Sequence, residues 1–237
     1  MPQPSRRVLG KAAAVAVAAM VLGACGSAPA VPPSITLTFI RHAQSEANAA
    51  GVIDTAIPGP NITAEGEQQA QKAANELRGN DYDGIYASPI IRTQETAAPL
   101  AKDLDEQVDV LPGLREISAG RFEGQPEAAA AATYFVAPMA WLHGDRNATI
   151  PDSVNGNEFN DQFTAAVQKI YESGDKKPVA FSHSAAIMLW TLMNVKNGKD
   201  SLLATHPLPN TGRVMIEGNP VTGWTLVNWD GITQFGP

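Results

Sequence analysis

The stretch ITLTFIRHAQSEAN occupies residues 35–48, and it sets the expected architecture of the chain. Residues 35–40 are rich in β-branched and aromatic side chains and follow a Pro-Pro break, so they predict a strand. Two basic side chains, Arg41 and His42, come directly after it. Because α/β sheets bind ligands at the carboxyl ends of their strands, this junction is a candidate site.

Outward from this stretch, short strands alternate with amphipathic helices. Strands are predicted at residues 84–87, 107–111, 178–182, 212–217 and 224–229. Helices are predicted at residues 63–78, 89–104, 156–173 and 184–194. The alanine-rich residues 125–145 are expected to be partly helical, with a break at Pro138. The alternation indicates an α/β sandwich with a mostly parallel sheet, whose last two strands form an antiparallel pair.

Four of these strand ends carry polar groups that suit phosphoryl chemistry. Arg41 and Arg92 offer guanidinium forks that match phosphate oxygens. The imidazoles of His42 and His183 offer a nucleophile near neutral pH, and the carboxyl group of Glu116 can protonate a leaving alkoxide. Each residue taken singly also has an ordinary structural explanation, such as a surface charge or a buried structural histidine.

The combination resembles branch 1 of the histidine phosphatase superfamily, the phosphoglycerate-mutase-like proteins. Five motifs occur in the family's order, at residues 41–48 (RHAQSEAN), 63–70 (TAEGEQQA), 87–97 (ASPIIRTQETA), 114–124 (LREISAGRFEG) and 179–184 (VAFSHS). A late turn that also resembles the family follows at residues 209–211. The resemblance implies a three-layer α/β/α sandwich with a small helical cap insert.

The same resemblance implies roles for individual residues. His42 would be the nucleophile that forms a phosphohistidine, and Glu116 the general acid and base. The residues implied in phosphate binding are Arg41, Asn48, Arg92, His183 and Ser184. His42 would be neutral and His183 protonated. The implied substrate is a small phosphomonoester, and no cofactor or metal ion is expected.

Two departures from the family pattern leave alternatives open. Ala43 replaces a glycine beside the nucleophile, which allows an inactive relative that serves as a surface-binding lipoprotein. Ile117 follows Glu116, and residues 125–142 contain no lysine or arginine, which favours hydrolysis over a phosphomutase of the same fold. Arg121 and Arg146 are possible substitutes for the missing cations.

The aromatic side chains near the insert allow two interpretations. They are Phe122, Tyr134, Phe135 and Trp141. They could form a lid over the organic part of a substrate, or they could be core residues of a helical cap.

The N-terminal segment is interpreted as an export signal. Arg6, Arg7 and Lys11 precede an apolar run at residues 12–24, which has the length of a signal-peptide core. The run ends in Leu22-Gly23-Ala24-Cys25, which resembles a bacterial lipobox, and the basic part also resembles a twin-arginine signal. A buried N-terminal helix with a stray cysteine is the alternative.

This interpretation divides the chain into three parts. We expect a signal peptide at residues 1–24, a lipid-anchored proline-rich tether at 25–34 and a single domain at 35–237. A lipid on Cys25 would hold the exported protein at the extracytoplasmic face of the cell membrane. The formal net charge of −7 argues against a nucleic-acid partner, because phosphate backbones require a basic face.

Overall fold

Strand β1 (Ile35–Arg41) lies in the interior of a six-stranded sheet of order β3-β2-β4-β1-β5-β6. The fold is that of a computed structural model, which describes Met1 and residues 32–235. The other strands are β2 (Gly84–Ala87), β3 (Val108–Val110), β4 (Pro178–Ser182), β5 (Arg213–Asn219) and β6 (Gly223–Trp229). The predicted Cys25 lipid site, the tether up to residue 31 and the signal peptide after Met1 lie outside the described residues.

The described residues also form eight α-helices. These are α1 (Glu46–Ala50), α2 (Ala64–Leu77), α3 (Ile91–Leu104), α4 (Glu127–Tyr134), α5 (Val136–Leu142), α6 (Gly156–Glu172), α7 (Ser184–Asn194) and α8 (Ser201–Thr205). Among the described residues, no helix combines the length and the apolar character needed to cross a bilayer.

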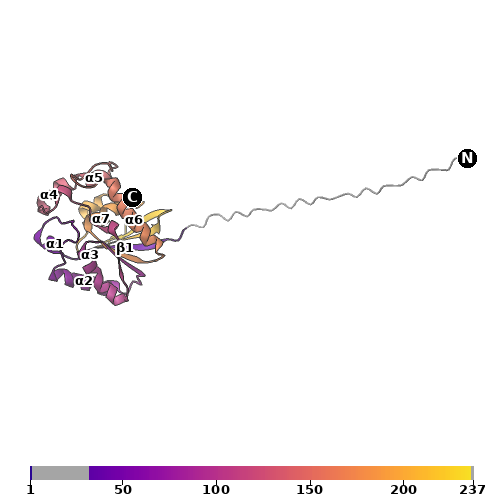
Figure 1. The fold of residues 1–237 in the computed structure, drawn as a ribbon, viewed down its shortest axis with the longest axis horizontal. Helices are drawn as coiled ribbons and strands as arrows, with labels where there is room; N and C mark the ends of the chain where they lie inside the picture. Colours follow the sequence, from indigo (N-terminus) through magenta and orange to yellow (C-terminus); the bar gives the residue numbers. More distant parts are fainter. Residues whose placement is uncertain (2–31, 236–237) are drawn as a thin grey trace. The chain divides into compact units, whose positions relative to one another are not determined.

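Two hydrophobic cores lie on opposite faces of the sheet. Side chains alternate along β1, so that Leu37 and Phe39 pack in a core with α6 and α7, while Ile40 packs in a core with α2 and α3. Figure 1 shows α2 and α3 on one side of β1 and α6 and α7 on the other. Strands β3, β2, β4 and β1 are parallel, and β5 and β6 are antiparallel. The predicted sandwich with a mostly parallel sheet is therefore confirmed.

The strand register positions the site. Arg41 lies opposite Ser182 in the parallel pair of β1 and β4, so His42 and His183 leave the sheet side by side. Ala87 of β2 lies opposite Phe181, which brings the residues after β2 to the same edge. Three strands thus deliver their following loops to one point at the carboxyl end of the sheet.

The cap segment corrects one prediction. The helical break falls at Phe135, between α4 and α5, and Pro138 lies inside the first turn of α5. A proline is tolerated there because the first N–H groups of a helix have no intrahelical acceptor.

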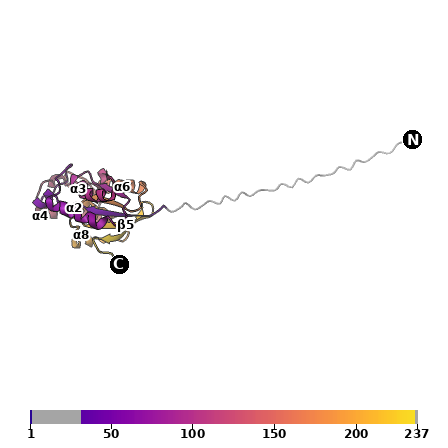
Figure 2. The same ribbon diagram turned by 90° about the horizontal axis from the view of Figure 1, so that it is seen from below.

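The bounds of two other predicted elements differ slightly from those in the structure. Helix α3 begins at Ile91 instead of Pro89, because Ser88 Oγ accepts a hydrogen bond from Ile90 N (3.1 Å) and closes a turn first. The third strand is two residues shorter than the predicted 107–111. The terminal pair is antiparallel as predicted, and Trp229 Nε1 donates to His206 O (2.8 Å), which ties β6 to the end of α8. Figure 2 shows α8 at the lower edge of the ribbon.

Candidate active site

A cavity of about 450 Å³ adjoins the carboxyl end of the parallel strands. The predicted site residues that line it are Arg41, His42, Asn48, Arg92, Glu116 and Ser184. They come from loops and helices that are far apart in the sequence, and the structure brings them together. His183 is fully buried and does not line the cavity, but it contacts Arg92.

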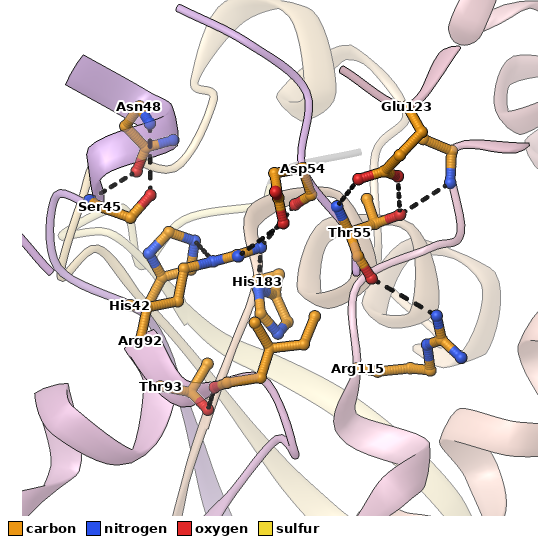
Figure 3. Close-up of polar contacts among 12 residues, drawn as sticks. His42, Ser45, Asn48, Asp54, Thr55, Arg92, Thr93, Arg115, Glu123 and His183 are labelled. Atoms are coloured by element: carbon orange, nitrogen blue, oxygen red, sulfur yellow. Dashed lines mark hydrogen bonds and ion pairs between the residues drawn. The ribbon is translucent and has the colours of Figure 1, made fainter. Parts of the chain in front are cut away.

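The ring of His42 is held in one tautomer by two partners, of which Figure 3 shows Arg92. Nδ1 lies 2.7 Å from Ala43 O, and a carbonyl oxygen can only accept, so Nδ1 carries the proton. Nε2 accepts a hydrogen bond from Arg92 Nε over 3.0 Å. We assign the tautomer from these partners, and it leaves the lone pair of a neutral imidazole on Nε2.

The surroundings of His42 also favour its neutral form. Burial lowers its pKa well below the usual 6.5, and the positive charges of Arg92 and Arg41 lower it further. A histidine in this state is a ready nucleophile, because its attacking nitrogen is unprotonated at neutral pH.

Arg92 joins the two histidines. Besides its bond to His42, its Nη2 contacts His183 Nδ1 at 3.3 Å and donates to Asp54 O at 2.9 Å. Its Nη1 lies 3.7 Å from the Asp54 carboxylate and has no hydrogen-bond partner among the described residues. Among the described residues, Arg92 forms its ion pair with Asp54 and not with Glu95 of the same helix, whose carboxylate accepts from Ile62 N (2.8 Å).

Arg41 supplies a second cationic group to the cavity. Its Nη1 donates to Leu208 O (2.6 Å), and its buried Nε finds no hydrogen-bond partner in residues 32–235. Buried donors without partners are costly, and the side chains of Arg41 and Arg92 both line the cavity, where an anion would pair with their positive charge. The cavity is therefore suited to a phosphoryl group at this end.

His183 differs from the protonated state expected of it. Its Nε2 lies 2.8 Å from Ser88 Oγ, and its Nδ1 faces the Arg92 guanidinium, which can only donate. Burial lowers the pKa of His183 well below 6.5, with further contributions from Arg92, His42 and Arg41. The hydrogen-bond partners thus assign the neutral form to both histidines. A dianion bound near them would be needed to raise the pKa of either ring.

Glu116 is held by the N-terminus of α7. Its Oε1 accepts from Ile117 N and Ala186 N, both at 2.9 Å, and its Oε2 accepts from Ala185 N at 3.3 Å. Burial raises the pKa of the carboxyl group, while these backbone donors and Arg92 act in the opposite direction. A carboxyl group with a raised pKa is suited to deliver a proton.

Several residues that shape the site were missed by the sequence analysis. Glu123 accepts from both Thr55 N (2.8 Å) and Thr55 Oγ1 (2.6 Å), which fixes the loop that presents Asp54 O to Arg92 (Figure 3). Asn210 Nδ2 donates to His42 O at 3.0 Å and lies 3.2 Å from Asn48 Oδ1. Glu123 and Asn210 lie within quoted motifs, but no local pattern marks Asp54 or Thr55.

Ala43 adopts an ordinary backbone conformation. It is fully buried, its N donates to Thr96 Oγ1 (2.9 Å), and it is not among the residues with a positive φ. The position therefore does not require glycine for its conformation, and the methyl group fits the core.

The proposed substitute cations lie elsewhere. Arg121 pairs with Asp152 (3.2 Å) at the surface, and Arg146 donates to Met193 O (3.2 Å). Neither lines the cavity.

The aromatic residues of the insert divide between the two interpretations. Tyr134 and Phe135 line the cavity, whereas Phe122 and Trp141 are buried in the core without lining it.

Within residues 32–235, no group of three His, Cys, Asp or Glu side chains is placed to hold a metal ion.

Comparison with known proteins gives the chain a family context. The model of the histidine phosphatase superfamily (branch 1) matches residues 37–230. The PE-PGRS family protein PE_PGRS11 of Mycobacterium tuberculosis is 49% identical over 215 residues, which cover 84% of this chain and 37% of that protein. A 2,3-bisphosphoglycerate-dependent phosphoglycerate mutase of Thermoplasma acidophilum is 36% identical over 87 residues, which cover 37% of this chain and 44% of the mutase. The chain thus spans less than half the length of these two relatives.

A solved structure shows the same fold. Phosphoserine phosphatase from Entamoeba histolytica, in complex with 3-phosphoglyceric acid, has a TM-score of 0.67 with this chain at 24% identity. The match covers 85% of this chain and 98% of the phosphatase.

Proposed function

The chain belongs to branch 1 of the histidine phosphatase superfamily, and from this premise we propose that it hydrolyses phosphomonoesters through a phosphohistidine on His42. The observation that carries the proposal is the state of His42: its ring is neutral, its Nε2 lone pair accepts from Arg92, and it lines a cavity together with the side chains of Arg41 and Arg92. The relatives include a mutase and the structural neighbours a phosphatase, which supports phosphoryl transfer or hydrolysis in general terms.

In the first step, His42 Nε2 attacks the phosphorus atom of the substrate. Arg92 exchanges its bond to Nε2 for bonds to phosphoryl oxygens, and Arg41 binds these oxygens as well. The P–N bond forms as the P–O bond to the alcohol breaks. Glu116 gives its proton to the leaving alkoxide oxygen, so the alcohol departs neutral.

In the second step, a water molecule attacks the phosphohistidine. Glu116, now a carboxylate, takes a proton from this water while the P–N bond breaks and its electrons return to Nε2. Inorganic phosphate leaves, and both side chains regain their starting states. His183 contributes by holding Arg92 through Nδ1, and Asn48 and Ser184 lie at the cavity wall as further hydrogen-bonding groups.

The cavity favours hydrolysis over mutase chemistry. A phosphomutase must hold the dephosphorylated product for a second transfer, which usually needs cations beyond those at the transferred phosphate. Arg121 and Arg146 contact other protein groups outside the cavity, so they do not bind the dephosphorylated product there. Release of the alcohol and entry of water are then the expected outcome.

The direct test is turnover of phosphomonoesters by the purified full-length chain. Release of phosphate should persist in EDTA, since no metal ion takes part, and it should vanish in His42→Ala. His143→Ala is the matched control, because His143 is an exposed histidine at the end of α5 and should leave turnover unchanged. Transfer between positions of a bisphosphate would identify a mutase, and no turnover at all would identify an inactive binding protein.

We also propose that the chain is exported and held at the membrane by a lipid on Cys25. The support is the sequence alone, namely the basic segment, the apolar run and Leu22-Gly23-Ala24-Cys25. In cell fractionation, Cys25→Ser should move the protein from the membrane to the soluble fraction, while Ser27→Ala should not. A Cys25→Ser protein that stays with the membrane would contradict the anchor.

A further inference from the structure

The cavity of the proposed active site is lined by both polar and apolar side chains. Besides the phosphoryl-binding side chains, a set of apolar side chains lines it from the cap, from α7 and from the segment around α8. We use "apolar wall" for Tyr134, Phe135, Met139, Met188, Leu203 and Leu208. A substrate bound with its phosphate at Arg41 and Arg92 would extend its organic part along this wall.

The wall offers carbon surface and few hydrogen-bonding groups. The hydroxyl group of Tyr134 donates to Ile117 O over 3.1 Å, so it is already used inside the protein. Tyr134 and Phe135 lie edge to face with their ring centroids 5.2 Å apart. Met139 and Met188 add flexible thioether side chains, which adapt to apolar ligands of different shapes. A polyol placed here would lose its bonds to water without replacement.

The charges of the cavity disfavour a second anionic group. Arg41 and Arg92 are the only arginine or lysine residues lining it in the described part of the chain. The acidic side chains of Asp54 and Glu127 also line it, and Glu127 lies close enough to Arg41 to act on its charge. A carboxylate or a second phosphate on the substrate would meet negative charge and no free cation.

From these observations we propose that the substrate is a single phosphate ester of a neutral, largely apolar alcohol. This inference rests on the proposed function, because it takes the phosphoryl group to lie at Arg41 and Arg92. Binding energy from the apolar part is gained by removing carbon surface from water, and the phosphate fixes the orientation of the molecule.

The test is a series of primary alkyl phosphates of increasing length, from ethyl to octyl phosphate. Their leaving alcohols have similar chemistry, so differences in kcat/KM report contacts with the wall. We expect kcat/KM to rise by up to about fourfold per added methylene group until the wall is covered. Propyl phosphate should also exceed glycerol 3-phosphate and 3-phosphoglycerate, which share its three-carbon length but carry hydroxyl and carboxylate groups.

Two substitutions locate the effect on the wall. Met139→Gln and Leu203→Asn keep the side-chain size but add polar groups, and both side chains are only partly buried. Each should reduce the ratio of hexyl to propyl phosphate activity, because the longer chain contacts more of the altered wall. Val221→Thr, at an exposed residue in the turn after β5, is the matched control and should keep the ratio.

Alkylphosphonates separate this inference from the proposed function, because they bind without being hydrolysed. If no ester is hydrolysed but phosphonate affinity rises with chain length, the wall is supported and the hydrolase proposal fails. If esters are hydrolysed with no dependence on chain length, or 3-phosphoglycerate is preferred over propyl phosphate, the apolar-substrate inference is wrong and hydrolysis stands.

Discussion

Arg92 donates a hydrogen bond from its Nε to Nε2 of His42 over 3.0 Å, and the same guanidinium reaches His183 Nδ1 at 3.3 Å. A cation held between two imidazoles keeps both rings unprotonated on the nitrogens that face it. Together with Ala43 O, this side chain therefore fixes the tautomer of the proposed nucleophile; it adds to the effect of burial in lowering the pKa of His42, and it offers donors to phosphoryl oxygens.

Replacement of Arg92 by lysine should separate charge from geometry. Arg92→Lys keeps the positive charge but loses the fork that contacts His42, His183 and Asp54 O together. We expect kcat/KM to fall by about 10²- to 10³-fold, the usual cost of removing a preorganised donor to a developing charge. Steady-state kinetics measure this, with Arg78→Lys at the surface as the control. A loss below about tenfold would show that charge alone suffices.

The buried histidines predict how stability depends on pH. The folded pKa values of His42 and His183 lie below 6.5, so the unfolded chain binds protons first as the pH falls. Their contribution to the free energy of unfolding should decrease below pH 6.5, by at most about 1.4 kcal/mol per pH unit for each histidine. Glu116 acts in the opposite sense, because its pKa in the folded protein is raised above 4.5. Its contribution to the free energy of unfolding is therefore lost as the pH rises through that folded-state pKa.

Urea unfolding between about pH 7.5 and about pH 5.5 in phosphate-free buffer measures this slope. His42→Asn should flatten it by removing one of the two histidines, whereas His143→Asn should keep the wild-type slope. An unchanged slope in His42→Asn would contradict the assignment of a neutral, buried His42.

Glu123 is predicted to act as a positioning residue. Both of its carboxylate oxygens accept from Thr55, and the adjacent Asp54 O accepts from Arg92. In Glu123→Gln only one oxygen can still accept, so the loop should loosen and kcat should fall by about tenfold, or roughly the 1.4 kcal/mol of one hydrogen bond. The pH profile should be retained and Glu123→Asp should restore part of the rate. Glu67→Gln, at an exposed acid of α2, is the control. An unchanged kcat in Glu123→Gln would show that Glu123 does not position the site.

Ala43 should make this chain more stable than the glycine of the family pattern would. Ala43→Gly removes a buried methyl group and adds backbone freedom to the unfolded chain, with no conformational gain in the fold. We expect a loss of about 1 kcal/mol in the free energy of unfolding and a kcat/KM within about twofold of wild type. Denaturant unfolding and kinetics measure both quantities. A large rise in activity would mean that the methyl group obstructs the cavity.

The sequence was sufficient to predict those parts of the fold that depend on local patterns. The strand at residues 35–40, the helices over 63–78 and 184–194 and the polar residues at strand ends all carry periodic or positional signals, and the structure confirms these elements. The helical break in the insert was misplaced because Pro138 was treated as a helix breaker, although the first turn of a helix tolerates proline.

The electrostatic state of the site could not be predicted from the sequence. The protonation of His183 depends on the Arg92 guanidinium facing its Nδ1, and that follows from packing of α3 against the sheet. Likewise, Asp54 and Thr55 lie in a loop without periodicity, and their contacts to Arg92 and Glu123 join residues far apart in the chain. Such long-range contacts leave no local trace in composition or spacing.

The most direct test of the whole account is identification of the phosphorylated residue. In Glu116→Gln the second step should be slow, whereas 4-nitrophenyl phosphate should still complete the first step, because its leaving group departs without a proton. A chemical quench after mixing with this ester should therefore trap the intermediate. The account predicts one phosphoryl group per chain, labile in acid and stable in alkali, mapped by mass spectrometry to His42 and absent from a His42→Ala/Glu116→Gln double variant. Phosphorylation of any other residue, or phosphate release by wild type with no trapped phosphohistidine in Glu116→Gln, would contradict it.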